Sequence, residues 1–424
     1  MPEKLLILLQ TKMTMNYLIN CFEKKIKGDI VLPASKSISN RLLIIKALAN
    51  HCFNISNLSD SDDTQVMLQA FRSNAESVNI GHAGTSMRFL TAYFAATAQQ
   101  KIMTGSERMK NRPIRELVNG LNQLGANITY VEKDGFPPLQ TSGKPLKGNK
   151  IDIDGSISSQ FITALLLVAP ALPEGLTINI TGKLISASYV KLTLRLMKQF
   201  GIKYTWKGHV IQIANQQYTG VNCTVEADWS GASYWYQIAA LADKADIVIH
   251  GLSSDSLQGD AALVELFEKL GIYSNFVNNA VLLRKEPCSL KFFEFDFINN
   301  PDLVQTFVVT LCLMGIPFKI SGADTLRIKE TDRIAALQTE MAKMGFVITE
   351  TEQGVLEWNG KQEEAQKHIV IDTYKDHRMA LAFAPAAVKL GKIIINDAMV
   401  VTKSYPAFWN DLVSAGFDVK EKLN

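Results

Sequence analysis

The stretch LTLRLMKQFG at residues 192–201 shows the pattern on which the whole chain is built. Its apolar residues recur at helical spacing, and Gly201 stands where the residue after a helix commonly takes the left-handed conformation. We therefore predict an amphipathic helix that ends at this glycine. Further segments of the same form end 70 to 76 residues apart, at Gly125, Gly271, Gly345 and Gly416.

A second series of predicted helices alternates with the first and is almost continuously apolar. Examples are TSMRFLTAYFAATA at 85–98, SQFITALLLVAPA at 159–171 and ASYWYQIAALA at 232–242. Such helices are expected to be buried, with the amphipathic ones covering them. The sequence therefore predicts an α/β protein of six units of about 70 residues each, in two similar domains of three units.

The first unit is shorter than the others. Only the eight residues SNAESVNI, 73–80, separate its outer helix from Gly81. In the other units this interval is long enough for a β-hairpin. We expect that hairpin to be missing from the first unit.

Composition restricts the class of protein. The chain has 424 residues and is 47% hydrophobic, enough for two cores, and its 44 Lys and Arg nearly balance its 41 Asp and Glu. This balance argues against a nucleic-acid partner. The five cysteines form no CxxC pair, so neither a disulfide framework nor a metal site is indicated.

No segment is expected to cross a membrane. The longest apolar run, FITALLLVAPAL at 161–172, is far shorter than the roughly 20 residues that span a bilayer. The run LLILL at 5–9 is short for the apolar region of a signal peptide. We therefore expect a cytoplasmic protein.

Basic residues stand at the starts of many predicted helices, where Lys and Arg are normally avoided because helix N-termini carry partial positive charge. If these helix ends meet in one cleft, they create a strong site for small, multiply charged anions. No P-loop or dinucleotide-binding glycine motif is present. The residues concerned are Lys36, Arg41, Arg88, Arg112, Lys329, Arg333, Lys375, His377, Arg378 and Lys403.

Several motifs together resemble the 5-enolpyruvylshikimate-3-phosphate synthases, in the family's order and spacing, over essentially the whole chain from about Ile26. SKSISNR and KETDR are highly specific to that family. The motifs are LPASKSISNR at 32–41, GTSMRFL at 84–90, RPIREL at 112–117, DGSISSQF at 154–161, PDL at 301–303, LRIKETDR at 326–333, DHRMA at 376–380 and TKSYP at 402–406.

The resemblance implies both a fold and an activity. The fold is an inside-out α/β barrel in each of two domains, each with three βαβαββ repeats. The activity is transfer of the enolpyruvyl group of phosphoenolpyruvate to the 5-hydroxyl of 3-phosphoshikimate, with release of phosphate, in the shikimate pathway to chorismate and aromatic amino acids. No cofactor or metal is implied, and we expect a monomer whose partners are these two small molecules.

The resemblance also implies domain boundaries. The chain would cross between domains near Pro33 to Ser35 and again near Asp228. Residues 35–227 would form the domain that mainly binds 3-phosphoshikimate. Residues 1–34 and 228–424 would form the other, which supplies the proton-transfer residues and most of the phosphoenolpyruvate clamp, a set of four cations: Arg112, Arg333, Arg378 and Lys403.

Site residues are assigned by the same resemblance. Proton transfer is implied for Asp302, Lys329 and Glu330, with Lys36 reaching both substrates. The implied 3-phosphoshikimate contacts are Lys36, Ser37, Arg41, Ser158, Ser159, Gln160, Ser186, Tyr189, Asp302 and Lys329. The implied phosphoenolpyruvate contacts are Lys36, Gly84, Arg112, Gln160, Arg333, Arg378 and Lys403.

Three positions depart from the pattern of many relatives. His82 stands where many carry Asn, and Phe89 follows an arginine where several carry Pro. Both are expected beside the phosphoenolpyruvate pocket. Thr325 replaces an Asn that contacts the shikimate ring in some relatives, so that contact is expected to be weakened.

Other interpretations are weighed against this one. A sister family performs the same chemistry on UDP-N-acetylglucosamine, but it carries Lys-Asn in place of Lys36-Ser37 and a reactive cysteine that GSERMKNRPIR at 105–115 lacks. A non-catalytic anion-binding scaffold would lack Asp302 and Glu330, and a nucleic-acid-processing enzyme would need a broader basic surface. Among single residues, Tyr189 could simply line the cleft, and His377 could have a capping or structural role.

Overall fold

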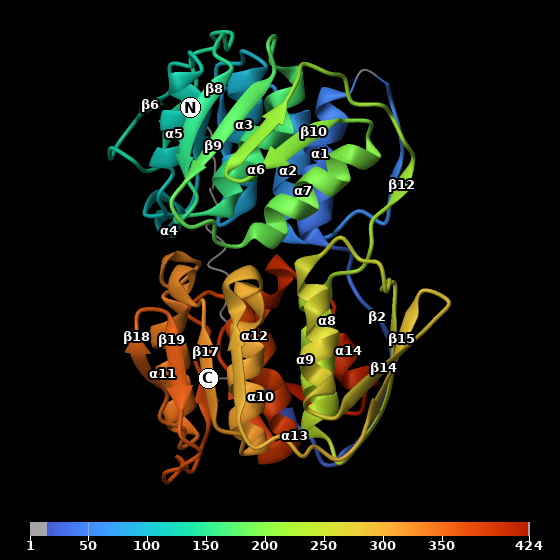
Figure 1. The fold of residues 1–424 in the computed structure, drawn as a ribbon. Helices are drawn as coiled ribbons and strands as arrows, with labels where there is room; N and C mark the ends of the chain where they lie inside the picture. The colour runs from blue at the N-terminus through green and yellow to red at the C-terminus, as the bar shows by residue number, and fades with distance from the viewer. Residues whose placement is uncertain (1–14, 50, 423–424) are drawn as a thin grey trace, which may run out of the picture.

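The structure, a computed structural model, describes residues 15–49 and 51–422. The run LLILL at 5–9 lies outside the described residues. Two hydrophobic cores divide the molecule into an upper and a lower half (Figure 1). The upper core draws on residues from Ala34 to Val225, and the lower core on Ile19 to Leu32 together with Ala227 to Phe417.

The upper half alternates strands and helices along the chain. Its elements are α1 (Lys36–Leu48), β3 (Ile55–Ser56), α2 (Asp62–Arg72), β4 (Ser77–Asn79), α3 (Gly84–Ala96), β5 (Ile102–Thr104), α4 (Glu107–Lys110), α5 (Arg115–Gln123), β6 (Thr129–Tyr130), β7 (Leu139–Gln140), β8 (Lys150–Asp154), α6 (Ser159–Val168), β9 (Leu176–Thr181), α7 (Ala187–Gln199), β10 (Tyr204–Lys207), β11 (Val210–Ile213) and β12 (Cys223–Thr224).

The lower half repeats this alternation and also contains the two N-terminal strands. Its elements are β1 (Asn16–Asn20), β2 (Lys25–Val31), α8 (Trp229–Leu241), β13 (Lys244–His250), α9 (Leu263–Glu268), β14 (Ile272–Val277), β15 (Ala280–Lys285), β16 (Phe293–Asp296), α10 (Val304–Met314), β17 (Phe318–Ser321), α11 (Arg333–Lys343), β18 (Thr349–Glu352), β19 (Val355–Trp358), β20 (Val370–Ile371), α12 (His377–Phe383), α13 (Ala387–Leu390), β21 (Lys392–Ile395), α14 (Phe408–Ser414) and β22 (Asp418–Lys422).

Each unit is organised around one parallel strand pair. Within the described residues there are six such pairs: β12 with β3, β4 with β5, β8 with β9, β2 with β13, β16 with β17, and β20 with β21. In four units an antiparallel hairpin extends the pair to four strands, as in the sheet order β16-β17-β19-β18. In the last unit β1 and β22, which are distant in sequence, occupy the place of the hairpin. The predicted α/β fold of six units is confirmed.

The first unit lacks its hairpin, as predicted. Its sheet contains only β12 and β3, although the other five sheets have four strands each in the described part of the chain. The sequence pattern did not reveal which segments close the sheets. Strand β2 joins the β13 sheet, and β1 pairs with β21 and β22, so the N-terminal strands complete two units of the lower half.

The almost continuously apolar helices form the centre of each half, as predicted. Helices α1, α3 and α6 contact one another in the upper half, and α10 contacts both α8 and α12 in the lower half. Every residue of α8 and of α12 is buried. The amphipathic helices end as predicted, because Gly125, Gly201, Gly271, Gly345 and Gly416 all have φ between 82° and 97°.

Two adjacent segments connect the halves. Ala34 pairs with Ala227 in an antiparallel bridge, and Ser35 N donates to the carbonyl of Glu226 at 2.8 Å. Asp228 N donates to the carbonyl of Pro33 at 2.9 Å. In the described residues no helix is both long and apolar enough to span a membrane.

Candidate active site

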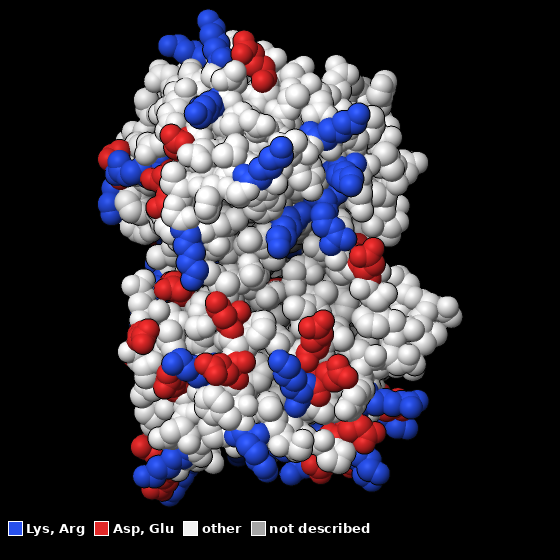
Figure 2. All heavy atoms as spheres, in the orientation of Figure 1, with Lys and Arg blue, Asp and Glu red and all other residues white. Residues whose placement is uncertain are grey.

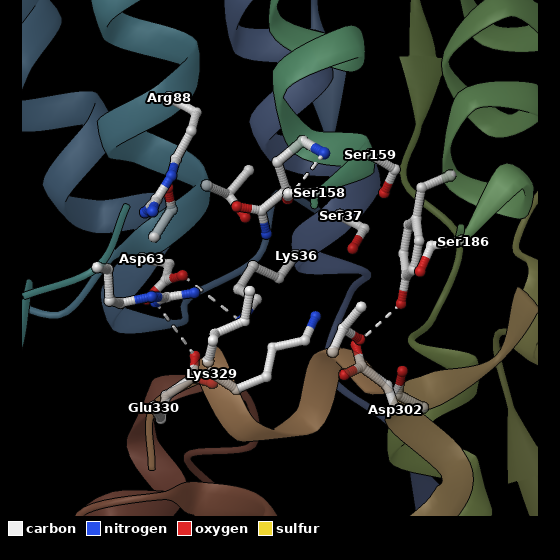
Figure 3. Close-up of a pocket in the computed structure, with 18 of the residues that line it drawn as sticks. Lys36, Ser37, Asp63, Arg88, Ser158, Ser159, Ser186, Asp302, Lys329 and Glu330 are labelled. Carbon is white, nitrogen blue, oxygen red and sulfur yellow. Dashed lines mark hydrogen bonds and ion pairs between the residues drawn. The ribbon is translucent and has the colours of Figure 1, made fainter. Parts of the chain in front are cut away.

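A cavity lies between the two halves, at the N-terminal ends of helices from both (Figure 3). Helices α1, α3 and α6 reach it from above with their first residues, Lys36, Gly84 and Ser159. From below, α11 and α12 contribute Arg333 and His377. The predicted convergence of helix starts is therefore present, and it directs several helix dipoles at one small space.

Local capping explains why these helices begin at the cavity. The Ser35 hydroxyl accepts from Ile38 N at the start of α1, and the Ser158 hydroxyl accepts from Gln160 N at the start of α6. Asp376 accepts from Arg378 N and so caps α12. The cap is therefore Asp376 and not His377, which is buried beside it; a structural role for His377 stays a prediction.

The structure brings together the residues that the sequence singled out. Of the implied substrate contacts, only Lys403 is outside the cavity lining, and its ammonium contacts the Glu330 carboxylate at 2.7 Å. Among the other basic residues at helix starts, Arg88 and His377 line the cavity, whereas Lys375 lines a second cavity. The predicted residues that line the cavity are Lys36, Ser37, Arg41, Gly84, Arg112, Ser158, Ser159, Gln160, Ser186, Tyr189, Asp302, Lys329, Glu330, Arg333 and Arg378.

Arg41 is held rigidly on the upper wall. Its guanidinium donates to the Thr193 hydroxyl at 2.7 Å and to the carbonyl of Ser37 at 2.7 Å. The same group lies over the ring of Phe89, 5.4 Å from its centroid. Burial lowers the pKa of Arg41 to about 10, which leaves it cationic at neutral pH. A fixed charge of this kind suits a phosphate ligand.

Asp302 lies at the junction of the two halves. Its carboxylate accepts from the Tyr189 hydroxyl at 2.9 Å, across the cleft. It also contacts the guanidinium groups of Arg378 at 2.8 Å and Arg333 at 3.1 Å. Burial acts to raise the pKa of Asp302, but Arg378, Lys329 and Arg333 outweigh it and hold the pKa well below its usual range.

Glu330 is surrounded by cations. Its carboxylate contacts Lys403 at 2.7 Å, Arg333 at 2.9 Å and Arg112 at 3.8 Å. Burial favours its neutral form, yet these three cations keep the pKa of Glu330 well below its ordinary value. Burial also lowers the pKa of Lys329, and Arg333 and Arg112 act in the same direction. Arg333 and Arg112 therefore act to lower the pKa of both Lys329 and Glu330.

Gly84 allows Arg112 to approach the backbone at the start of α3. A Cβ atom placed on Gly84 would lie 2.5 Å from Nη1 and 2.9 Å from Cζ of Arg112. Arg112 is buried, although its only acidic contact among the described residues is the long one to Glu330. A side chain at position 84 would therefore force the guanidinium to move.

Two of the three residues that depart from many relatives line the cavity, and the third, His82, lines a second cavity with Arg112 and Glu330. Phe89 and Thr325 line the cavity, and the carbonyl of His82 accepts from the Lys403 ammonium at 3.3 Å. The hydroxyl of Thr325 is buried and makes no hydrogen bond within the described residues. His250, by contrast, contacts Asp29 on strands away from the cavity.

Sequence reasoning missed several acidic and polar residues of the site. Asp63 contacts the Lys36 ammonium at 3.5 Å, and Asp376 accepts from Arg333 Nε at 2.7 Å. The Asp260 carboxylate accepts a hydrogen bond from the Ser230 hydroxyl at 2.5 Å. Burial, together with the nearby Asp302 carboxylate, raises the pKa of Asp260 to about 6. Asp63 and Asp260 lie outside the helix-start clusters of basic residues, and Asp376 lies within one, but only the spatial partners of all three reveal their role.

The charge of the two halves is unequal. Residues 35–227 contain 20 Lys and Arg against 12 Asp and Glu, whereas the remaining residues contain 24 against 29. Figure 2 shows Lys and Arg prominent on the upper half of one face, with both signs on the lower half. An anion that approaches the cleft therefore meets a net positive upper wall. Among the described residues, no group of three or more His, Cys, Asp or Glu could hold a metal ion.

Comparison with known proteins decides the family. The sequence profile of EPSP synthase (3-phosphoshikimate 1-carboxyvinyltransferase) matches residues 22–74 and 73–412. The chain belongs to the EPSP synthase family. A relative from Bacteroides fragilis, named 3-phosphoshikimate 1-carboxyvinyltransferase, is 49% identical over 407 residues, which cover 96% of this chain and 99% of the relative.

More distant members show the same family and fold. A relative of the same name from Colwellia psychrerythraea is 36% identical over 417 residues, covering 92% of this chain and 96% of its own. The crystal structure of an EPSP synthase from Acinetobacter baumannii superposes with a TM-score of 0.75 at 23% identity, over 96% of this chain and 100% of that one. At that identity the structural likeness supports the fold of the EPSP synthase family and nothing more specific.

Proposed function

We propose that this protein transfers the enolpyruvyl group of phosphoenolpyruvate to the 5-hydroxyl of 3-phosphoshikimate and releases phosphate. The observation that carries the proposal is the cavity itself, where carboxylates held ionised by buried cations lie beside a set of anion-binding groups. Its relatives' name and the family match support the same reaction. The shikimate pathway to aromatic amino acids is the corresponding biological role.

The acceptor is assigned to the upper wall. Hydroxyl groups and helix N-termini are available at Ser37, Ser158 and Ser159. Arg41 adds a fixed guanidinium. Such groups are suitable partners for a phosphate monoester. Tyr189 is placed with them, since its hydroxyl reaches Asp302. The full proposed set is Lys36, Ser37, Arg41, Ser158, Ser159, Gln160, Ser186, Tyr189, Asp302 and Lys329.

Phosphoenolpyruvate is assigned to the cationic cluster around Glu330. The three guanidinium groups of Arg112, Arg333 and Arg378 can bind carboxylate and phosphate oxygens in pairs. Lys403 adds a point charge on the far side of Glu330. Gly84, Gln160 and Lys36 complete the proposed contacts.

The reaction requires two proton transfers on opposite sides of the reacting carbons. As the 5-hydroxyl oxygen attacks C2, it loses its proton and C3 gains one, which gives a tetrahedral adduct. The C2–O bond to phosphate then breaks while C3 returns a proton. We assign Asp302 to the hydroxyl side and Glu330 with Lys329 to the methylene side, because the two carboxylates approach the cavity from different segments: Asp302 from the 3₁₀-helix η4 (Pro301–Leu303) and Glu330 from the loop before α11.

The domain assignment rests on the two cores. Residues 35–227 are proposed as the acceptor domain, and residues 1–34 with 228–424 as the clamp domain. The separate hydrophobic clusters and the antiparallel connection at Ala34 and Ala227 support this division. We further propose that the protein acts as a monomer in the cytoplasm.

UDP-N-acetylglucosamine is the alternative acceptor. It is disfavoured because Ser37 lines the cavity in place of the sister family's Asn, and because no cysteine lies among the described residues of the cavity wall. Free phosphate measured with phosphoenolpyruvate and each acceptor separately tests the assignment. We expect release with 3-phosphoshikimate alone, unchanged by a chelator; release with the nucleotide sugar only would overturn the proposal.

A further inference from the structure

Arg108 connects the two halves at the loop that carries Lys329 and Glu330. Its Nε donates to the carbonyl of Glu330 at 3.0 Å, and its Nη2 donates to the carbonyl of Lys329 at 2.8 Å. One side chain from the upper half therefore binds the backbone of both residues assigned to the methylene side. The planar guanidinium fixes the relative position of its two donors, so the pair of bonds sets an orientation as well as a distance.

The loop is otherwise short of regular hydrogen bonding. Lys329 and Glu330 lie between the 3₁₀-helix η5 (Asp324–Ile328) and the start of α11, in neither element. Their carbonyls accept no helical or strand hydrogen bond within the described residues. Outside regular structure, the direction of a side chain depends on whatever holds the backbone. At Lys329 and Glu330 the group that holds the backbone is the Arg108 guanidinium.

The helix that carries Arg108 is firmly attached to the upper half. The Ser106 hydroxyl caps α4 by accepting from Met109 N at 3.3 Å, and Met109 is 1% exposed. The Met109 carbonyl accepts from Arg112 N at 3.0 Å, so the same short segment places Arg112 in the cavity. Movement of the upper half therefore moves Arg108 and Arg112 together.

We propose that Arg108 is a positioning residue that aligns Lys329 and Glu330 for proton transfer when the two halves close. It also lines a second cavity together with Arg112 and Glu330, so it lies next to the residues assigned to the reaction. Because α4 connects Arg108 to Arg112, binding of an anion at Arg112 is coupled to the placement of Lys329 and Glu330. The inference rests on the proposed function, because it assigns a role within that reaction.

The side chain is exposed, so its hydrogen bonds compete with water and contribute little to global stability. This distinguishes positioning from a purely structural role. Loss of Arg108 should leave the melting temperature and the affinity for 3-phosphoshikimate unchanged. Misplacement of the loop should instead slow the proton-transfer steps, with a larger effect on kcat than on KM.

The experiment compares Arg108→Ala and Arg108→Lys with a matched control, Arg115→Ala. Arg115 is also an exposed arginine of the upper half, close to Arg108 in sequence, but it pairs with Asp134 of its own half at 2.6 Å. We expect Arg108→Ala to lower kcat about tenfold and to increase the solvent deuterium isotope effect on kcat. Arg108→Lys should recover part of the loss, and the control should match the parent.

Hydrogen–deuterium exchange on the substrate complex adds a readout independent of turnover. Amides of residues 327–332 should exchange faster in Arg108→Ala than in Arg115→Ala. A kcat within twofold of the control, or an equal loss of kcat, acceptor affinity and melting temperature, would overturn the inference. A parent that releases no phosphate would contradict the proposed function instead, and the exchange comparison would still decide whether Arg108 holds the loop.

Discussion

Single residues in the cavity are placed by steric and electrostatic requirements that can be tested one at a time. Gly84 and Arg112 show the steric case, because a methyl group and the guanidinium cannot occupy the same space. Asp302 shows the electrostatic case, because two guanidinium groups and a phenol keep its carboxylate ionised.

Gly84→Ala should displace Arg112 and weaken phosphoenolpyruvate binding. The new Cβ would lie 2.5 Å from Arg112 Nη1, so the guanidinium must move. We expect KM for phosphoenolpyruvate to rise about tenfold, with the affinity for 3-phosphoshikimate little changed. Gly120→Ala in α5 is the control, because its Cβ would meet only ordinary contacts at 3.5 Å and 3.6 Å. An unchanged KM in Gly84→Ala would show that Arg112 adapts without loss.

Asp302→Asn should reduce turnover far more than acceptor binding. The amide keeps the shape of the side chain but cannot act as a base, and such a group typically contributes about 10²–10⁴-fold. Calorimetry with 3-phosphoshikimate, thermal melting and kcat should be measured on the same preparation. A lowered melting temperature with kcat within about tenfold of the parent would assign Asp302 to structure alone.

The basic residues of this site could be predicted from sequence, whereas several of its acidic residues could not. Lys36, Arg333 and Arg378 are conspicuous because a cation at a helix start contradicts the helix dipole. Asp63, Asp260 and Asp376 contradict no local preference. Their significance depends on contacts to Lys36, Ser230 and Arg333, which only the folded chain brings near.

At the scale of elements, the glycine-terminated helices were predictable because their signal is local. The sheets were only partly predictable. The missing hairpin of the first unit was predicted from chain length, but the partners of β1, β2 and β12 come from distant parts of the sequence. Strand pairing of that kind leaves no local periodicity to detect.

Gly271→Ala should destabilise the protein more than Gly315→Ala. Both glycines have a left-handed φ after a helix, +82° and +71°, but a Cβ on Gly271 would lie 2.4 Å from the Glu286 carbonyl oxygen. Apart from the residues next to it in the chain, no described residue has an atom within 4 Å of a Cβ on Gly315. In urea unfolding we expect losses of about 1 kcal/mol for Gly315→Ala and about 2–4 kcal/mol for Gly271→Ala. Equal losses would refute the steric argument.

At the scale of the whole molecule, contacts across the cleft imply that the halves separate to admit ligands. Tyr189 bonds Asp302 at 2.9 Å, and Thr402 bonds Asp62 at 2.9 Å on another part of the interface. The proposed acceptor set lies mostly above, whereas three cations of the phosphoenolpyruvate clamp, Arg333, Arg378 and Lys403, lie below. A complete site therefore requires the two halves to approach each other.

Small-angle scattering should detect this motion. We expect the radius of gyration to fall when 3-phosphoshikimate is added at a concentration where calorimetry confirms binding. Tyr189→Phe removes one cross-cleft bond and should shift the free protein towards the open form. No compaction of the parent on ligand binding would mean that the halves are rigid and that substrates enter by another route.

The most direct test of the account is a single turnover in D₂O with excess protein over phosphoenolpyruvate and 3-phosphoshikimate. The proposed adduct gains a solvent-derived hydrogen at C3 before it loses one, so deuterium should appear in the methylene group of the enolpyruvyl product, with one phosphate released per product. Mass spectrometry and proton NMR of the product measure both. A product without deuterium, or phosphate released in the absence of 3-phosphoshikimate, would contradict addition and elimination at this site.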